Sequence, residues 1–358
     1  MSSKIVFTIA KIDRSCIGHS KLFSMKVLFI RFSSLGDVLL TTPIIRTFRT
    51  HFPDAEIHFL TKKQFSPLLE YNPFIDTIIS FDSENESMLL LITRLQKEHY
   101  THIIDLHDKL RSALIKRFVR GKVITYKKKH NYRNKMLKDH DLKPIFSTVD
   151  LYASVLEDFD LSLDERKLEL FLPDNEHDIA TSFLPADKTR IVTISPGASW
   201  HTKQYPTKYY KKIIRHLLDH YDVRIVLIGT GQEKNLTTEL AALFENKILD
   251  LGGRTSLIES VVIIKHSDLF ISGDCGPMHI AATFGIPQIA IFGPTHPKLG
   301  FSPINTNAVI IQKDLPCRPC SLHGRGKCPK AHFKCMMDIK PEEIFEKIVD
   351  IIKRNDIK

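Results

Sequence analysis

The sequence predicts an α/β protein with two Rossmann-like halves that face each other across a cleft. Apolar runs of strand length alternate with helical patterns, which is typical of parallel sheets covered by helices. The alternation runs from Met25 to Leu172, is interrupted by a polar, proline-bounded segment, and resumes at Arg190. A chain of 358 residues with 43% hydrophobic residues can form two ordinary cores.

The first half is expected over residues 25–172. Residues 1–24 show no periodic pattern, so they are interpreted as a flexible tail or as the product of a start codon assigned one methionine too early. The apolar run from Lys26 to Phe32 predicts a buried first strand. The strands predicted for this half are 26–32, 56–60, 76–81, 101–106 and 122–126.

The second half is expected over residues 190–340, after an interdomain linker at 173–189. Its predicted strands are 190–194, 223–228, 247–249, 268–271 and 288–292. Pro341 then begins a C-terminal helix over 341–358, in which Ile344, Ile348 and Ile351 form one apolar stripe.

Composition and charge favour a cytoplasmic protein with a basic surface. No apolar run approaches the roughly 18 residues of a membrane helix, and the run at 5–10 is too short for a signal peptide. The formal net charge is +10, and residues 116–143 hold eleven Lys or Arg against two Asp. Such a segment can meet nucleic acid, an anionic membrane or an acidic substrate, and charge alone does not choose among them.

The most informative turn follows the strand that ends at Ile271. There the chain passes through Gly273-Asp274-Cys275-Gly276-Pro277-Met278-His279 into a helix. The free N–H groups of a first helical turn and the helix dipole both favour an anion such as phosphate. Asp274 would repel phosphate, so it is expected to accept hydrogen bonds from hydroxyl groups. A diphosphate beside a polyol describes a nucleotide sugar.

Two further turns follow predicted strands. Asp37 comes shortly after the first strand, where ligands bind in open parallel sheets, and it could take a proton from a hydroxyl or merely cap a helix. After the strand 190–194, Ser199, Thr202 and Lys203 suit phosphate contact, with a solvated loop as the alternative. Neither the turn before Asp37 nor Gly229-Thr230-Gly231 completes a dinucleotide fingerprint, which disfavours a nicotinamide enzyme.

Together these blocks resemble glycosyltransferase family 9, the ADP-heptose:lipopolysaccharide heptosyltransferases, which have the two-domain GT-B fold. The matching blocks are Ser-Leu-Gly-Asp at 34–37 with Thr-Thr-Pro at 41–43, Pro-Gly-Ala-Ser-Trp at 196–200, Gly-Asp-Cys-Gly-Pro-Met-His at 273–279, and Phe-Gly-Pro-Thr at 292–295. The resemblance covers about residues 25–340. It implies an inverting, metal-independent transfer of a heptose from ADP-heptose to the lipopolysaccharide inner core, with no cofactor required.

The resemblance also implies roles for single residues. Asp37 would be the general base, Lys203 would neutralise the donor phosphates as ADP departs, and Asp274 would hold heptose hydroxyls. The donor-binding residues expected in this way are Ser199, Thr202, Lys203, Glu233 near the ribose, Asp274, Gly276, Pro277, Met278 and His279. The chain departs from the family at Gln204-Tyr205, where a basic residue and Trp are common, and at Cys275, where Ser or Thr is usual.

The basic segment gains an interpretation from this resemblance. Arg111, Lys128 and Arg133 are expected to contact an anionic acceptor of the Kdo/heptose–lipid A type, and solvated loops are the alternative. Neighbouring lysines would hold the enzyme peripherally at the cytoplasmic face of the inner membrane. Nucleic acid is not expected as a partner, because the few aromatic residues near this segment do not alternate as a stacking platform.

A cysteine-rich segment closes the predicted second half. Cys317, Cys320, Cys328 and Cys335 resemble a small zinc knuckle, and a cytosolic location disfavours stable disulfides. The resemblance implies a structural cap on the second half, because relatives in the family carry the same cluster. Structural zinc is the alternative, and the proposed chemistry needs no metal there.

Two other functions stay open at this point. One is a GT-B enzyme that uses another nucleotide sugar, either as a transferase or as an epimerase. The other is a basic binding module without enzymatic activity. Turnover of ADP-heptose without an acceptor would favour the first, and salt-dependent binding to nucleic acid without affinity for nucleotide sugars would favour the second.

Overall fold

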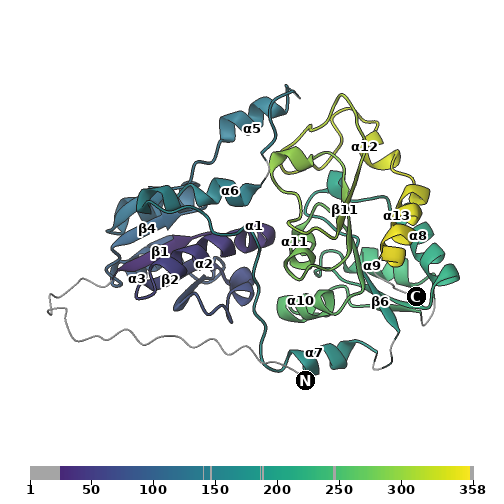
Figure 1. Ribbon diagram of the computed structural model, residues 1–358, viewed down its shortest axis with the longest axis horizontal. Coiled ribbons are helices and arrows are strands. Elements are labelled where there is room, and N and C mark those ends of the chain that lie inside the picture. Colours follow the sequence, from purple (N-terminus) through teal and green to yellow (C-terminus); the bar gives the residue numbers. More distant parts are fainter. Residues whose placement is uncertain are drawn as a thin grey trace, which may run out of the picture.

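The computed structural model describes residues 25–354 except 140, 146, 186, 188, 245 and 246. The predicted tail at 1–24 and the last four residues of the predicted C-terminal helix lie outside the described residues. Two parallel sheets dominate the fold, each in its own half of the molecule (Figure 1).

The first sheet has five parallel strands in the order β3-β2-β1-β4-β5. Its central strand β1 pairs with β2 on one side and with β4 on the other, and its last four residues are buried. The strands are β1 Lys26–Ile30, β2 Glu56–Lys62, β3 Thr77–Phe81, β4 His102–Asp105 and β5 Lys122–Thr125.

The second sheet has six parallel strands in the order β11-β10-β9-β6-β7-β8. Every residue of β9 and β10 is buried, as expected for central strands covered by helices on both faces. The strands are β6 Arg190–Ser195, β7 Val223–Leu227, β8 Ile248–Asp250, β9 Leu269–Gly273, β10 Gln288–Phe292 and β11 Ala308–Gln312.

Helices connect the strands and cover both sheets. Those of the first half are α1 Leu35–Leu39, α2 Thr42–His51, η1 Lys63–Leu68, α3 Met88–Gln96, α4 Leu110–Phe118, α5 His130–Met136, α6 Thr148–Ala153 and η2 Leu156–Phe159. Those that follow are α7 Glu176–Phe183, η3 His201–Lys203, α8 Thr207–His220, α9 Lys234–Ala241, α10 Leu257–Lys265, α11 Gly276–Thr283, η4 Pro297–Leu299, α12 Lys334–Met337 and α13 Pro341–Arg354.

The structure confirms the ten predicted strands, with ends that differ by up to two residues, and adds β11 at the edge of the second sheet. The predicted linker contains a helix, α7, which packs against α10. In α13 the predicted stripe is buried: Ile344 and Ile348 are 0% exposed and Ile351 is 2% exposed. This stripe packs toward α8 and β10, so α13 stays with the second half.

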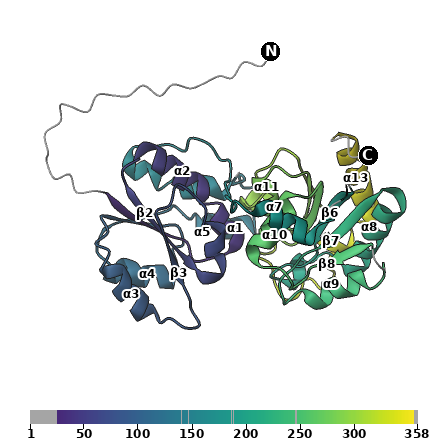
Figure 2. The same cartoon turned by 90° about the horizontal axis from the view of Figure 1, so that it is seen from below.

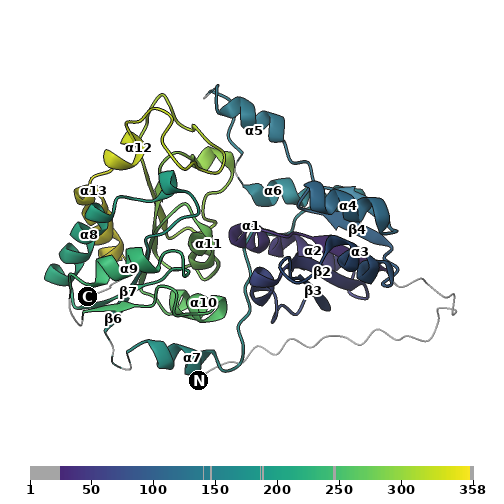
Figure 3. The ribbon, with the colours of Figure 1, turned by 180° about the vertical axis from the view of Figure 1, so that it is seen from behind.

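The two halves meet along α1 and α11, which lie side by side in three views of the molecule (Figures 1, 2 and 3). A second contact joins η1 of the first half to α10 of the second. One apolar core cluster continues through this junction, from Leu68 and Leu69 to Val261 and Ile264. Apolar packing therefore joins the two halves on one side of the cleft.

The strand orders fix where a ligand can bind. In an open parallel sheet, the crevice for a ligand opens at the carboxyl ends of the strands where the strand order reverses. These points lie between β1 and β4 in the first sheet and between β6 and β9 in the second. Asp37 follows β1, Lys203 follows β6 and Asp274 follows β9, so the predicted site residues follow strands at these points.

None of the helices among the described residues is long and apolar enough to cross a membrane.

Candidate active site between the two halves

A cavity of about 400 Å³ lies between the halves, and residues of both line it. From the first half come Arg31, Ser33, Ser34, Gly36, Asp37, His107, Lys109, Tyr126, Lys128, His130, Arg133 and Tyr152. From the second come Ser199, Trp200, Lys203, Asp274, Cys275, Gly276, His279, Phe301, Leu322 and His323. Eight of the predicted site residues are in this set.

Asp37 faces the cavity from the first turn of α1, and its carboxylate accepts four hydrogen bonds. Arg31 Nη2 lies 2.7 Å from Oδ1, and the Tyr152 hydroxyl donates to the same oxygen at 3.0 Å. Ser34 donates to Oδ2 from its backbone N–H at 3.0 Å and from its hydroxyl at 2.7 Å. Asp37 therefore caps α1, which was one of the two alternatives, and it also lines the cavity, while its role as a base stays a prediction.

These partners keep Asp37 ionised. Burial by itself would raise the pKa of the carboxyl group. The Arg31 guanidinium and the hydrogen bonds from Ser34 and Tyr152 outweigh burial and hold the pKa of Asp37 well below its usual range. The Arg31 side chain is 9% exposed and that of Asp37 is 17% exposed, so solvent screens the pair little.

Asp274 and Lys203 form the corresponding pair in the second half. Lys203 Nζ lies 2.8 Å from Asp274 Oδ2, and the Thr295 hydroxyl donates to the same oxygen at 2.6 Å. Both side chains are largely buried, yet both line the cavity. They stand beside the first turn of α11, whose N-cap residue Cys275 makes no side-chain capping hydrogen bond.

His279 lies on α11 where the two halves touch. The side chain is buried, and its Nδ1 has no hydrogen-bond partner among the described residues. Burial lowers the pKa of His279 to about 4, and Asp274 and Asp37 oppose the shift from the two sides of the cleft. The imidazole is therefore neutral at pH 7.

The other predicted donor residues do not line the cavity. The Met278 side chain is completely buried in a core cluster with Ala290 and Phe292. Thr202 is buried, and its hydroxyl accepts a hydrogen bond from the backbone N–H of Arg325. Pro277 occupies the second position of α11. Glu233 accepts hydrogen bonds from the backbone and hydroxyl of Thr230 at the start of α9.

The predicted acceptor residues separate into two groups. Lys128 and Arg133 line the cavity, whereas Arg111 is exposed elsewhere and lies over the ring of Phe81. Arg133 donates to the Thr148 hydroxyl and to the Leu299 carbonyl, and its Nε is buried without a partner among the described residues.

Several lining residues were not predicted. Arg31 belongs to the predicted first strand, and Tyr152 lies 115 residues beyond Asp37, so no local pattern links them to it. His107 is buried, with its Nδ1 unpartnered among the described residues, and burial lowers its pKa to about 4. The sequence could have indicated His107, because this residue follows β4, next to which the strand order reverses.

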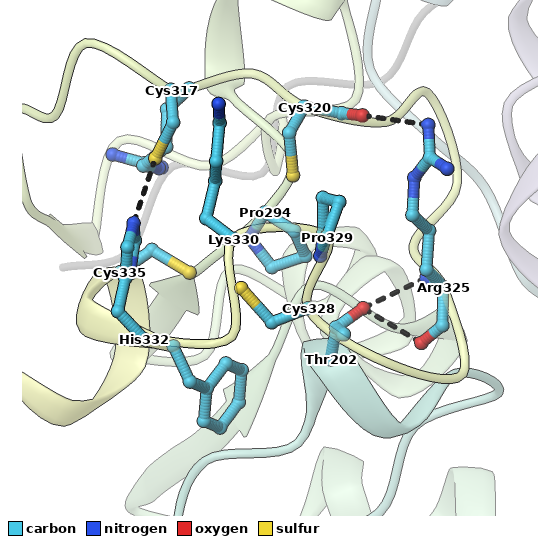
Figure 4. Close-up of a pocket in the computed structure, with 12 residues that line it drawn as sticks. Thr202, Pro294, Cys317, Cys320, Arg325, Cys328, Pro329, Lys330, His332 and Cys335 are labelled. Atoms are coloured by element: carbon cyan, nitrogen blue, oxygen red, sulfur yellow. Dashed lines mark hydrogen bonds between the residues drawn. The ribbon is translucent and has the colours of Figure 1, made fainter.

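The four cysteines of the predicted cap converge on a separate small void of about 10 Å³, which His332 also lines (Figure 4). All four thiols are free, and Cys317 Sγ lies 3.8 Å from His332 Nε2. Among the described residues, no group of three or more His, Cys, Asp or Glu side chains is arranged to hold a metal ion. Arg318 joins the segment to the second sheet through a hydrogen bond to the carbonyl of Phe292, and its role as a cap stays a prediction.

Comparisons with known proteins show the family and the fold of the chain. The chain is 27% identical over 332 residues to lipooligosaccharide heptosyltransferase 2 of Campylobacter jejuni, covering 90% of this chain and 97% of that protein. The structure resembles E. coli ADP-heptose lps heptosyltransferase II, with a TM-score of 0.73, 21% identity, and coverage of 93% and 100% of the two chains. It also resembles E. coli heptosyltransferase WaaC with ADP-2-deoxy-2-fluoro heptose, with a TM-score of 0.65, 17% identity, and coverage of 91% and 99%.

Both solved structures have the GT-B fold that the sequence predicted. The family model described as glycosyltransferase family 9 (heptosyltransferase) matches residues 88–327, two thirds of the chain. The protein is thus a glycosyltransferase and belongs to glycosyltransferase family 9.

Proposed function

We propose that this protein transfers a heptose from ADP-heptose to the inner core of lipopolysaccharide, with inversion at the anomeric carbon and without a metal ion. One observation carries the proposal: Asp37 and the Lys203–Asp274 pair line the same cavity from opposite halves. The donor assignment is supported by the solved E. coli relative that holds ADP-2-deoxy-2-fluoro heptose and by the relatives named as heptosyltransferases.

In this proposal the second half holds the donor. The diphosphate lies at the first turn of α11, where backbone N–H groups and the helix dipole favour negative charge. Lys203 adds a full positive charge, so the lysine and the helix supply what a divalent cation otherwise supplies to a nucleotide sugar. Asp274 exchanges its contact with Lys203 for hydrogen bonds from heptose hydroxyls.

The first half holds the acceptor and activates it. A hydroxyl oxygen of the acceptor attacks the anomeric carbon from the face opposite ADP, and the bond from that carbon to the phosphate oxygen breaks. Asp37 takes the hydroxyl proton. A carboxylate with a depressed pKa is a weak base, so the proton moves late, when the forming bond has made the hydroxyl acidic.

The acceptor side of the cavity is strongly basic. Lys109, Lys128 and Arg133 line it and would attract the carboxylates and phosphates of a Kdo- or heptose-bearing lipid A. Lys129, Lys135 and Lys138 are exposed around α5, which projects from the first half (Figure 1). They would bind the anionic cytoplasmic face of the inner membrane and place the lipid-linked acceptor at the cavity.

Binding and transfer assays test the proposal directly. Isothermal calorimetry compares ADP-heptose with UDP- and GDP-sugars on the wild-type protein and on Asp274→Ala. Transfer to Kdo–lipid A and to heptosylated core acceptors is then followed in the presence of EDTA, and the anomeric configuration of the product is read by NMR. Selective ADP-heptose binding and an inverted product are expected. Binding of another nucleotide sugar alone would move the function to a different branch of the fold.

A further inference from the structure

The cysteine-rich segment, residues 317–335, contributes to the wall of the active-site cavity through Leu322 and His323. Arg318 anchors the segment, because its buried guanidinium donates to the carbonyls of Phe292 at 3.1 Å and Thr295 at 2.8 Å. Cys320 N–H donates to the carbonyl of Pro294 at 3.0 Å. These bonds hold the segment at the carboxyl end of β10, beside the donor side of the cleft.

A tight turn sets the position of His323. The Ser321 hydroxyl accepts hydrogen bonds from the backbone N–H groups of His323 at 3.2 Å and Gly324 at 2.9 Å. Gly324 has φ +100°, a conformation that favours glycine. The turn is thereby closed by its own backbone and by a buried serine.

The same turn is joined to the loop that carries Lys203. The Thr202 hydroxyl makes two hydrogen bonds to the Arg325 backbone, at 2.8 Å each (Figure 4). Thr202 N–H also donates to the Arg325 carbonyl at 3.1 Å. A Cβ added at Gly324 would lie 2.9 Å from Cδ of Lys203, so backbone and lysine are in close contact. The turn that carries His323 therefore packs against the loop that carries Lys203.

The His323 ring is exposed to the cavity, and the described residues include no hydrogen-bond partner for it. Four charged side chains act on it: Asp37 on α1, Lys109 before α4, Arg133 on α5 and Lys203 on η3. His323 thus lines the same cavity as the proposed base and the proposed phosphate-binding lysine, and its ring nitrogens have no hydrogen-bond partner among the described residues.

We propose that His323 is a further catalytic residue of this enzyme, whose imidazole contacts the diphosphate of the nucleotide-sugar donor beside Lys203. The inference rests on the proposed function and adds a residue to it. As the bond between the anomeric carbon and the phosphate oxygen breaks, its electron pair stays on that oxygen. His323 donates a hydrogen bond to the diphosphate as this charge develops, while the proton of the acceptor hydroxyl goes to Asp37.

The charges around His323 give the proposal a second readout. Burial lowers the pKa of His323. The positive charges of Lys109, Lys203 and Arg133 lower it further, whereas the negative charge of Asp37 raises it. Before the donor binds, the imidazole is therefore harder to protonate than an ordinary histidine side chain. A bound diphosphate adds negative charge beside the ring and raises its pKa, so donor binding takes up a proton.

The test compares His323→Ala and His323→Gln with the wild type. The expected result is a loss of kcat/KM for ADP-heptose on the order of 10²-fold, with the acceptor KM unchanged. Calorimetry of ADP binding in two buffers of different ionisation enthalpy should show proton uptake by the wild type that is absent in His323→Gln. His332→Gln, in the same segment but facing the other void, and His177→Gln, exposed on α7, serve as controls.

Three results separate the outcomes. A wild-type protein that neither binds nor turns over ADP-heptose overturns the proposed function itself. With an active wild type, kcat/KM of His323→Ala within twofold of the wild type overturns the role of His323. So does a change confined to the acceptor KM. Melting curves of both His323 variants that match the wild type exclude a loss caused by unfolding.

Discussion

Gly36 of α1 and His279 of α11 are in direct contact across the junction of the two halves. A Cβ added at Gly36 would lie 2.5 Å from Cδ2 of His279, a distance that real Cβ atoms do not show. The absence of a side chain at Gly36 thus lets Asp37, the next residue, approach the donor side of the cleft. The geometry that brings base and donor together depends on this contact.

Gly36→Ala should force the halves apart or displace His279. We expect kcat/KM to fall by about tenfold or more, because small misplacements of reacting groups are costly, and the melting temperature to drop. Gly231→Ala is the matched control, since no atom lies within 4 Å of an added Cβ there. Equal activity of the two variants would show that the contact is not needed for turnover.

Asp37→Asn removes the proposed base and leaves Arg31 with a neutral partner. We expect kcat to fall by about 10²- to 10⁴-fold and the free energy of unfolding to fall by about 3 kcal/mol, because Arg31 keeps a buried, uncompensated charge. Steady-state transfer assays and urea denaturation measure the two effects. Asp150→Asn, which breaks an exposed pair with Arg166, should change neither by much.

Arg31→Met tests the electrostatics of Asp37 by pH. The folded pKa of Asp37 is depressed, so its ionised form stabilises the protein above the unfolded pKa of about 4, and this stabilisation is lost as the pH falls toward the folded pKa. Without Arg31 the pKa of Asp37 rises. The acid limb of a kcat/KM–pH profile should therefore move to higher pH. In Arg31→Lys this limb should move less, because a positive charge beside Asp37 is kept.

Lys203→Met tests the charge on the donor side. The variant leaves Asp274 as an uncompensated anion where the diphosphate should bind, so we expect the Kd for ADP-heptose to rise by about 10²-fold. Adding Asp274→Asn should recover part of the affinity for ADP alone, because the repulsion is removed. Lys208→Met, at a lysine that lies over the Tyr209 ring, is the control. No recovery in the double variant would contradict the repulsion.

Sequence patterns predicted the strands of both sheets and the turns that border the cavity, because buried strands and strand-to-helix turns are local features. The strand β11 was missed although Val309, Ile310 and Ile311 are apolar and β-branched, because it follows a polar stretch and lies at the sheet edge. Asp37, Lys203 and Asp274 were found because each follows a strand whose carboxyl end faces the cleft.

The partners of these residues were beyond the reach of local patterns. Tyr152 reaches Asp37 across 115 residues, and the turn at His323 meets Thr202 only because the cysteine-rich segment folds back over the second sheet. Met278 illustrates the opposite case. Its place in the motif predicted a contact with the donor, whereas its side chain packs in the core. Motifs locate a turn, and tertiary packing decides which side chains face the ligand.

Of the three residues predicted to bind the acceptor, Lys128 and Arg133 line the cavity and Arg111 does not. Lys128 lines the cavity and donates to the Asp108 carbonyl at 2.9 Å, while Arg111 lies outside it. We expect Lys128→Ala to raise the acceptor KM by about tenfold with little change in donor KM, because one positive charge facing an anionic acceptor is lost.

Arg111→Ala is the matched comparison, because it removes one positive charge from the same half without altering the cavity. Its acceptor KM should stay within about twofold of the wild type, since an exposed charge far from the ligand is screened by salt. The acceptor KM of wild type should also rise with ionic strength, and less steeply in Lys128→Ala. A larger effect from Arg111 than from Lys128 would place the acceptor along α4 instead of in the cavity.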